Sequence, residues 1–390
     1  MTFKPENFLS KAVTQLPPSG IRKFFDIAAE MDDVISLGVG EPDFVTPWHI
    51  RDEGVYSLEK GHTHYTPNRG LSELRIEISN YMKRRFNLSY EPLTQTIVTV
   101  GGSEAIDIFL RSVIEPGDEV LIPEPSFVCY KPITQLCGGV AVPVLTTAEH
   151  SFKLTAEALS SAITEKTKVL VLPYPNNPTG GIMTKEDLEE IAEVIRKHDI
   201  MILSDEIYAE LTYGRKHISI ASIDGMYERT MVVSGFSKAY AMTGWRLGYA
   251  CGHPDIITQM TKIHQYAIMS APTTAQYAAI EALRNGDNDI EVMREEYDSR
   301  RKIIVSGFNS MGLDCFEPEG AFYAFPSIKS TGLSSGDFCE KLLYSNKVAV
   351  IPGTAFGDCG EGHIRCSYAY SLENINEALE RIESFVKKVR

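Results

Sequence analysis

The chain has 390 residues, of which 43% are hydrophobic and 23% are charged, as in an average globular protein. Its formal net charge of -14, without any run of Lys or Arg, argues against nucleic acid as a partner. We find no apolar signal-peptide core and no uncharged apolar run of about 18 residues, so we expect a cytoplasmic protein with no membrane partner. The length allows two domains.

The cysteines do not form a recognisable framework. They are seven in number, lie far apart at positions 129, 137, 251, 315, 339, 359 and 366, and include no C-x-x-C pair. We therefore predict neither disulfides nor a metal site, and expect most of these cysteines to be small core residues.

Short apolar runs alternate with amphipathic stretches between residues 96 and 250. The runs are rich in β-branched residues and cover residues 96–100, 119–123, 140–145, 168–174, 200–205 and 230–236. Nearly continuous apolar character is typical of parallel strands that are covered on both faces. The clearest helix is predicted at 184–199, where Thr184 can cap and Leu188, Ile191 and Ile195 form the buried stripe. The alternation predicts an α/β domain with a mostly parallel sheet.

The pattern changes after about residue 286. A long polar helix is predicted at 289–312, followed by short strands within 320–328, 348–357 and 363–369. In the final helix, one apolar face is formed by Leu372, Ile375, Leu379, Ile382 and Val386. We therefore predict a large domain at 45–285 and a small α+β domain made of 286–390 and the N-terminal segment 1–44.

Ligands of such sheets bind at the carboxyl ends of the strands, where four loops carry polar residues. In "VTVGGSEAID", Gly102 and Ser103 open a helix whose free N–H groups attract an anion such as phosphate. A tight turn that merely needs glycine is an equally good interpretation. In "LPYPNNPTGG", Asn177 either belongs to a rigid turn or directs its amide into the crevice.

The other two loops carry a carboxylate and an amine. Asp205 ends an apolar strand, where a charge is costly unless a cation offsets the lost hydration. A structural salt bridge is the alternative, and Tyr208 follows three residues later. In "SGFSKAYAMTGWRLGY", Lys238 follows a strand directly, and a desolvated lysine becomes a nucleophile for carbonyl groups. Arg246 has the fork geometry that suits phosphate, although each residue alone could be a surface charge.

Together these groups match the phosphate, ring nitrogen, hydroxyl and aldehyde of pyridoxal phosphate. The sequence also resembles the class I/II pyridoxal-phosphate aminotransferases of fold type I. The shared motifs are "GEPDF" (40–44), "HYTPNRG" (64–70), "PNNPTG" (175–180), "SDEIY" (204–208), "SGFSKAYAMTGWRLGY" (234–249) and "HIRCSYA" (363–369). The resemblance covers nearly the whole chain and implies a large domain with a mostly parallel seven-stranded sheet plus a small α+β domain.

The resemblance also implies roles for the catalytic groups. Lys238 would form the imine with the cofactor aldehyde and then move the proton between substrate and cofactor. Asp205 would keep the pyridine nitrogen protonated. Tyr208 and Asn177 would hydrogen-bond the 3'-oxygen.

Further residues would hold the phosphate and the substrate. The resemblance assigns the phosphate to the backbone of Gly102 and Ser103, to Arg246 and to Tyr65 of the partner subunit. It places Phe127 on the cofactor ring, and it assigns the substrate α-carboxylate to Arg365, Gly40 and Asn177.

Two features depart from the family pattern. Many members carry a serine three residues before the lysine, whereas this chain has Gly235 there, and Ser237 could replace that phosphate contact. Phe127 stands where other members carry tryptophan. Arg111 is a candidate for binding a second substrate carboxylate, although a surface arginine is the better interpretation of its context.

We therefore expect a homodimeric, ping-pong aminotransferase. The motif sequences resemble those of the subgroup that contains the aromatic, aspartate-type and N-acetyl-diaminopimelate aminotransferases. The resemblance implies 2-oxoglutarate as one of the 2-oxo acid substrates. A carbon-sulfur β-lyase with the same cofactor is the first alternative. A non-catalytic regulatory module is the second, and the complete set of catalytic residues argues against it.

Overall fold

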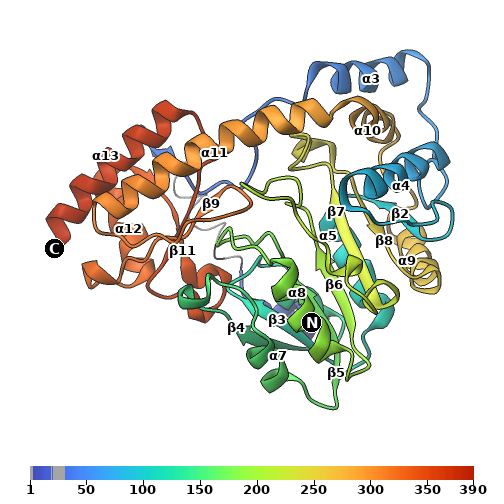
Figure 1. Cartoon of the computed structure of the whole chain (residues 1–390), viewed down its shortest axis with the longest axis horizontal. Coiled ribbons are helices and arrows are strands. Elements are labelled where there is room, and N and C mark those ends of the chain that lie inside the picture. Colours follow the sequence, from blue (N-terminus) through green and yellow to red (C-terminus); the bar gives the residue numbers. More distant parts are fainter. Residues whose placement is uncertain (1–2, 19, 21–30) are drawn as a thin grey trace.

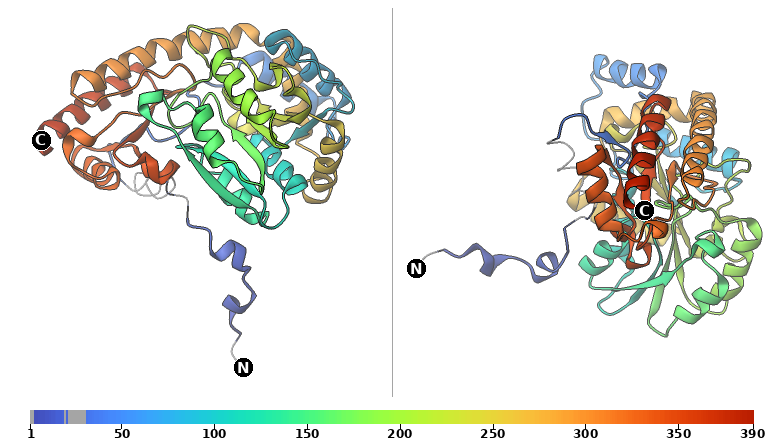
Figure 2. Two further views of the ribbon diagram at one scale, coloured as in Figure 1. Left: turned by 60° about the horizontal axis from the view of Figure 1, so that its bottom comes forward. Right: turned by 90° about the vertical axis from the view of Figure 1, so that its left-hand side faces the viewer.

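The computed structural model describes residues 3–18, 20 and 31–390. Residues 1–2, 19 and 21–30 of the predicted N-terminal segment therefore lie outside the described residues. The central sheet with its helices forms one part of the molecule, and the C-terminal helices α11 to α13 pack together at the other end (Figure 1). Residues 3–18, with η1 (Pro5–Phe8) and α1 (Lys11–Thr14), project from this body (Figure 2).

The central sheet has seven strands in the order β2-β8-β7-β6-β5-β3-β4. The strands are β2 (Thr96–Thr99), β3 (Glu119–Glu124), β4 (Val140–Leu145), β5 (Thr167–Leu172), β6 (Met201–Asp205), β7 (Thr230–Gly235) and β8 (Gly248–Cys251). Neighbouring strands are parallel from β4 to β7, and β8 is antiparallel to both β7 and β2. The predicted mostly parallel seven-stranded sheet is confirmed.

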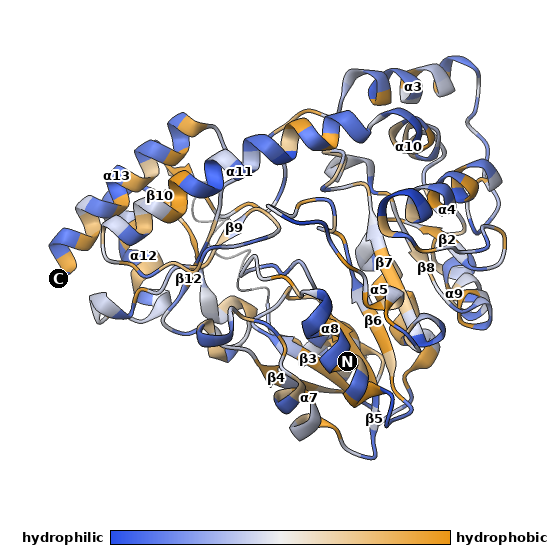
Figure 3. Cartoon of the chain, in the orientation of Figure 1, coloured by the Kyte–Doolittle hydropathy of each residue, from blue (hydrophilic) through white to orange (hydrophobic). Residues whose placement is uncertain are grey.

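Alternate residues of each strand face opposite helical layers. In β5, Val169 and Val171 pack with the core of α5 (Gly102–Val113) and α9 (Pro254–Ala267), whereas Leu170 and Leu172 pack with α7 (Ala156–Ala162) and α8 (Lys185–Ile195). Helices α4 (Ser72–Phe86) and α10 (Thr273–Asn285) extend this second layer, and α3 (Trp48–Glu59) packs on α10. Helix α6 (Tyr130–Leu136) joins the first layer. The middle residues of the central strands are therefore hydrophobic, whereas polar and charged residues such as Glu119, Lys168 and Asp205 lie near the strand ends (Figure 3).

Helix α8 shows how closely sequence and structure agree where the signals are local. The Thr184 hydroxyl accepts from the Asp187 N–H and the Asp187 carboxylate accepts from the Thr184 N–H, which forms a capping box. Leu188, Ile191 and Ile195 are buried as predicted. The helix ends at Ile195, before the basic residues that were expected to close it.

The C-terminal region contains short strands and three long helices. Its elements are α11 (Asp287–Ser310), β9 (Tyr323–Ala324), α12 (Ser335–Asn346), β10 (Val348–Ala349), β11 (Ile351–Pro352), β12 (Ile364–Ser367) and α13 (Leu372–Val389). Strands β11, β12 and β9 form an antiparallel sheet, and β10 pairs with β1 (Ile35–Ser36). The predicted apolar face of α13 is buried except at Leu372, which is 38% exposed because it lies in the first turn of the helix.

Two global features follow from the described coordinates. All seven cysteines are free, and four of them are buried. Within residues 3–18, 20 and 31–390, no helix has the length and apolar character needed to cross a membrane.

Candidate active site

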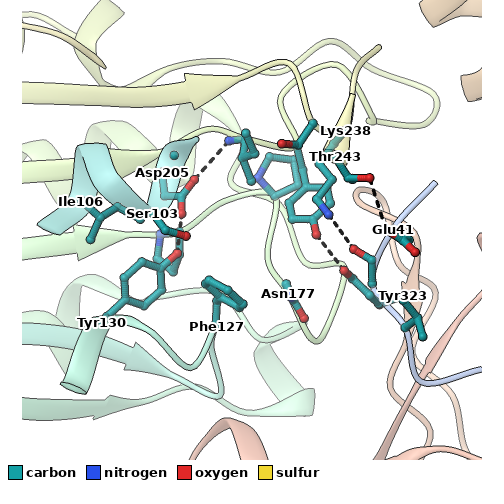
Figure 4. Close-up of a pocket in the computed structure, with 18 of the residues that line it drawn as sticks. Glu41, Ser103, Ile106, Phe127, Tyr130, Asn177, Asp205, Lys238, Thr243 and Tyr323 are labelled. Carbon is teal, nitrogen blue, oxygen red and sulfur yellow. Dashed lines mark hydrogen bonds between the residues drawn. The ribbon is translucent and has the colours of Figure 1, made fainter. Parts of the chain in front are cut away.

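A cavity of about 350 Å³ lies at the carboxyl ends of the parallel strands, where both parts of the chain meet (Figure 4). Its walls come from the segments after β2, β3, β5, β6 and β7, from segment 39–41, and from β9 and β12. The structure brings together every predicted site residue except Tyr65: Gly40, Gly102, Ser103, Phe127, Asn177, Asp205, Tyr208, Lys238, Arg246 and Arg365.

The first wall is built to receive an anion. Gly101 has a φ of +80°, and α5 begins directly after it with Gly102 and Ser103, so the first N–H groups of the helix point out of its end. The Arg246 guanidinium lies so close that a Cβ at Gly101 would come within 2.8 Å of it. Arg246 forms no ion pair with another described residue, which leaves its charge for a ligand.

Asp205 is a buried carboxylate without a cation. It is 7% exposed and ends β6, and it accepts hydrogen bonds from the Tyr130 hydroxyl (2.7 Å) and the Ile207 N–H (3.2 Å). Burial raises the pKa of Asp205, against the lowering effect of the Tyr130 hydrogen bond. No Lys, Arg or His of the described chain pairs with it, so the structural salt bridge considered from the sequence is wrong.

Lys238 is an amine in an unfavourable environment for charge. Its Nζ donates to the Gly40 carbonyl at 2.5 Å and lies 5.8 Å from the centre of the Tyr208 ring. Burial lowers the pKa of Lys238 to about 8; the Glu41 carboxylate works against this, and the guanidinium groups of Arg365 and Arg246 add to it. A substantial fraction of this amine is therefore neutral near physiological pH.

Arg365 places a buried guanidinium next to Asn177 in the cavity wall. It donates to the Asn177 Oδ1 at 3.0 Å and to the Gly38 carbonyl, and its guanidinium lies 4.6 Å from the centre of the Tyr323 ring. Its buried Nε has no hydrogen-bond partner in the described chain. Burial lowers the pKa of Arg365, and no carboxylate of the described residues neutralises it. A carboxylate ligand would meet both needs.

Tyr323 belongs to the site although the sequence did not identify it. Its hydroxyl lies 2.7 Å from the Tyr208 hydroxyl, and a Cβ at Gly40 would collide with it. Tyr323 is opposite Ser367 in the β9–β12 pair, so it shares a face with Arg365, two residues before Ser367. The strand alternation in "GAFYAFPSI" was the available signal, but it needed the register with β12.

Tyr130 and the two residues at the mouth of the cavity, Glu41 and Thr243, were also not identified from the sequence. Tyr130 is the first residue of α6, three positions after Phe127, and the sequence provided no signal that its hydroxyl would contact Asp205. At the mouth, the Thr243 hydroxyl donates to the Glu41 carboxylate at 3.2 Å. Both residues lie within shared motifs, "GEPDF" and "SGFSKAYAMTGWRLGY", but the sequence provided no signal for their contact.

The two departures from the family pattern have local explanations. Gly235 lies opposite Gly248 across β7 and β8, and a Cβ at Gly235 would come within 3.0 Å of the Gly248 Cα. A side chain at this position is therefore crowded. Ser237 lines the cavity, where its hydroxyl is available for a ligand. Phe127 also lines the cavity and meets the Tyr130 ring edge to face.

Two candidate residues lie elsewhere. Tyr65 does not line the cavity of its own chain, and it is 82% exposed. Arg111 lies on α5 and pairs with Asp107 four residues before it, at 2.8 Å, outside the cavity. Arg111 therefore has the position of a surface arginine, which was the better interpretation of its sequence context.

The cavity thus combines an anion cradle, an uncompensated carboxylate, an amine with a lowered pKa and a buried guanidinium. A cationic ring, an aldehyde and a phosphate on one ligand would satisfy the first three groups. A substrate carboxylate would satisfy the last. Such a combination supports chemistry in which an amine of the protein reacts with a carbonyl group.

The chain is similar to known aminotransferases. The profile of the family "Aminotransferase class I and II" matches residues 32–382. The putative aminotransferase YugH of Bacillus subtilis (strain 168) is 56% identical, over 98% of this chain and 99% of that protein. An aspartate aminotransferase of Pyrococcus abyssi is 48% identical, over 97% and 98%.

The structure agrees with this relationship. The crystal structure of an aromatic aminotransferase from Pyrococcus horikoshii OT3 superposes with a TM-score of 0.90 at 45% identity, covering 94% of this chain and 99% of that one. The fold and the sequence lead to the same conclusion: the chain belongs to the class I and II aminotransferase family and is an aminotransferase of fold type I.

Proposed function

We propose that this aminotransferase uses pyridoxal phosphate to exchange the amino group of an L-amino acid with the oxo group of a 2-oxo acid. One observation carries the proposal: a buried carboxylate that lacks a cation, Asp205, lines the same cavity as a lysine whose pKa is lowered to about 8, Lys238. Neither group is stable by itself in this position, and the cofactor would satisfy both.

The residues around the cavity fit the parts of the cofactor. Asp205 would hold the ring nitrogen in its protonated form, because a cation there replaces the hydration that the buried carboxylate has lost. Gly102, Ser103 and Arg246 would bind the phosphate. Phe127 would lie against the ring.

When bound, pyridoxal phosphate supplies an aldehyde for the substrate amine and a ring that stabilises negative charge at the substrate Cα. Lys238 Nζ acts as the base that takes the Cα proton and returns it, which requires the neutral amine that its lowered pKa provides. Tyr208 and Asn177 orient the ring through its hydroxyl oxygen. The hydrogen bond between Tyr208 and Tyr323 fixes the direction of the Tyr208 hydroxyl.

Arg365 would bind the α-carboxylate of both substrates in a bidentate manner, helped by Gly40 and Asn177. Two of the relatives named above are named for aspartate or for aromatic amino acids, which supports a donor of one of these classes. We propose 2-oxoglutarate as the acceptor. The apolar cavity residues Ile106 and Ile207 are compatible with an uncharged side chain.

A homodimer is part of the proposal. Tyr65 is 82% exposed and lies outside its own cavity, as expected for a residue that contributes to the site of a second copy. Tyr266 in the last turn of α9, and Ile268 and Met269 directly after this helix, are exposed apolar residues. The Asn68 amide donates to the Met269 carbonyl at 2.8 Å and so ties this region to the Tyr65 segment. We also propose the domain boundaries 45–285 and 1–44 with 286–390; a cytoplasmic location stays a prediction from the sequence.

Half-reactions test the activity and the substrate class together. The purified holoenzyme is mixed with each of the twenty amino acids in turn, and conversion of the bound cofactor to its amine form is followed by absorbance. We expect fast conversion with aspartate, glutamate or aromatic donors. Release of pyruvate and thiol from cystathionine without an added oxo acid would instead indicate a β-lyase.

The cofactor assignment has its own test. Borohydride reduction of the holoprotein followed by peptide mapping should place the label on the peptide that contains Lys238. A label on another lysine, or a protein that never takes up the cofactor, would overturn the proposal.

A further inference from the structure

A buried histidine is bonded to the helix that carries the predicted phosphate cradle. His264, on α9, is 0% exposed, and its Nδ1 lies 2.6 Å from Oε1 of Glu104. Glu104 is the third residue of α5, directly after Gly102 and Ser103. The pair connects α9 to the turn that lines the cavity, but His264 itself does not reach the cavity.

Glu104 binds two donors at once. Its Oε2 accepts from the Val100 N–H, and its Oε1 accepts from His264. Because an ionised carboxylate can only accept, the proton of this contact belongs to the His264 Nδ1. The carboxylate therefore bridges the end of β2 and the side of α9, and its direction is fixed at both oxygens.

The orientation of the Glu104 carboxylate affects how well the start of α5 can bind an anion. A glutamate in the first turn of a helix is attracted to the same free N–H groups that attract a phosphate. If Glu104 were released, its charge would compete with the phosphate for Gly102 and Ser103 and would repel it. Two hydrogen bonds hold that charge back against Val100 and α9.

The turn itself leaves little room for adjustment. The Thr99 hydroxyl donates to the Gly101 carbonyl at 3.0 Å, and a Cβ at Gly248 would come within 2.6 Å of the Gly102 nitrogen. The turn therefore cannot move away from a released carboxylate without disturbing β8. Repulsion of the phosphate can therefore be avoided only by the orientation of the Glu104 side chain, which His264 holds together with the Val100 N–H.

We propose that His264 is a positioning residue for the cofactor phosphate and acts through Glu104, which it holds away from the anion cradle. The inference rests on the proposed function, because it assumes that the cradle binds the phosphate of pyridoxal phosphate. It concerns residues outside the cavity, and it predicts an effect on the phosphate rather than on the aldehyde or the ring.

The test compares two ligands that differ only in the phosphate. Apoprotein prepared from the holoenzyme is titrated with pyridoxal phosphate and with pyridoxal, and the two dissociation constants are measured by fluorescence. His264→Leu should weaken pyridoxal phosphate by about tenfold or more, the range expected when a hydrogen bond to a charged group is lost. The affinity for pyridoxal should change by less than about twofold.

A second substitution separates positioning from a general structural role. Glu104→Gln keeps an acceptor for the Val100 N–H but removes the charge, so it should restore phosphate-specific affinity when combined with His264→Leu. His264→Asn, whose amide can replace Nδ1 as a donor, should bind pyridoxal phosphate nearly as well as the wild type. His264→Met provides the same test if the leucine variant does not fold.

His253→Leu is the matched control, because His253 caps the start of the same helix and its ring nitrogens lie near Glu228 and Asp255 instead of Glu104. It should leave the ratio of the two dissociation constants unchanged. Equal losses for both ligands in His264→Leu, or no recovery with Glu104→Gln, would overturn the inference. A wild-type protein that binds neither ligand would instead refute the proposed cofactor.

Discussion

Asp205 is placed where a carboxylate without a cation reduces the stability of the protein. Its pKa is raised by burial, which means that the folded chain without cofactor holds the ionised form less well than the unfolded chain does. Asp205→Asn keeps an acceptor for the Tyr130 hydroxyl and removes the charge. We expect the apoprotein variant to melt about 1–3 °C higher than the wild-type apoprotein, and its transamination rate to fall by about a hundredfold or more.

Calorimetry of the two apoproteins and steady-state kinetics check this prediction. Asp118→Asn is the control, because the pKa of Asp118 is shifted in the opposite direction. Asp118 pairs with Lys168 at 2.7 Å, and this hydrogen bond is the main cause of its lowered pKa. That variant should not gain stability at neutral pH. An Asp205→Asn apoprotein that is less stable than the wild type would show that the carboxylate is already compensated.

Lys238 should react with the cofactor aldehyde in a pH range far below that of an ordinary lysine. With a pKa of about 8, about one molecule in ten carries the neutral amine at pH 7, because each pH unit below the pKa reduces the neutral fraction about tenfold. The rate at which apoprotein takes up pyridoxal phosphate should therefore rise with pH and level off above about pH 8. Stopped-flow absorbance over a pH series measures this midpoint.

Glu41 provides the control for this pH profile. Its carboxylate raises the pKa of Lys238 against the effect of burial. Glu41→Gln should therefore shift the midpoint to lower pH without removing Lys238. A wild-type midpoint near that of free lysine, or an unchanged midpoint in the variant, would contradict the assignment of this environment.

The site residues that could be predicted from the sequence are ionisable residues next to apolar strands. A carboxylate at the end of an apolar strand, Asp205, and an amine three residues after another strand, Lys238, are conspicuous without a structure. Tyr323 and Tyr130 are aromatic residues in apolar contexts, and only the register of β9 with β12 and the start of α6 direct them into the cavity. Their partners, Tyr208 and Asp205, are distant in sequence, so local patterns could not identify the contacts.

At the scale of the elements, strands were predictable where burial on both faces makes the run apolar. β5 is the clear case, because Val169 and Leu170 face opposite helical layers and are both buried. β8 was missed: it has four residues, begins at Gly248 and follows the lysine motif without a turn signal. Its position between β2 and β7 depends on a close approach of Gly248 to Gly101 and Gly235, which only the fold shows.

One histidine of helix α3 contacts carboxylates on two neighbouring helices, which makes this contact sensitive to pH. His49 Nδ1 lies 2.7 Å from Glu281 on α10, and its Nε2 lies 2.9 Å from Asp289 on α11. Burial lowers the pKa of His49, but the hydrogen bonds and charges of Asp289 and Glu281 outweigh it, so the pKa is raised above 6.5. Both nitrogens can donate only in the imidazolium form.

The sign of the pH dependence follows from the raised pKa. The contribution of His49 to stability is fully present below pH 6.5 and is lost as the pH rises through the higher pKa of the folded state. His49→Gln should therefore lower the free energy of unfolding by about 1 kcal/mol at acidic pH, since the ion pairs are partly exposed, and by little at alkaline pH. Urea unfolding of both proteins over a pH series measures the difference.

His62→Gln serves as the comparison, because the His62 ring stacks on Tyr277 at 4.5 Å and forms no ion pair with the described residues. Its effect on unfolding should not depend on pH in the same way. If the His49→Gln difference is constant from acid to alkaline pH, the imidazolium bridge does not stabilise α3.

At the scale of the whole molecule, the site depends on parts of the chain that are far apart in sequence. Segment 38–40 supplies carbonyl groups to both Lys238 and Arg365. Its continuation at Asp43 is held by the buried Arg300 of α11, with both carboxylate oxygens 2.8 Å from the guanidinium. The long helix therefore supports the substrate side of the cavity while α5 supports the phosphate side, and assembly of the site requires the complete fold.

The proposed dimer makes the site depend on a second chain as well, and subunit mixing tests this. In a symmetric dimer each cavity would combine its own Lys238 with Tyr65 of the partner subunit. Lys238→Ala and Tyr65→Ala homodimers should both have low activity. When the two variants are unfolded, mixed in equal amounts and refolded, about half of the dimers should be mixed, and one of the two sites in each mixed dimer should contain both native residues. We expect recovery of about a quarter of the wild-type activity.

Arg111→Ala mixed with Lys238→Ala is the control. Arg111 pairs with Asp107 on the surface of its own chain, so the Arg111→Ala homodimer should already be active before mixing. Activity that does not rise on mixing Lys238→Ala with Tyr65→Ala, in a sample shown to contain mixed dimers by mass spectrometry, would mean that Tyr65 does not serve the partner site.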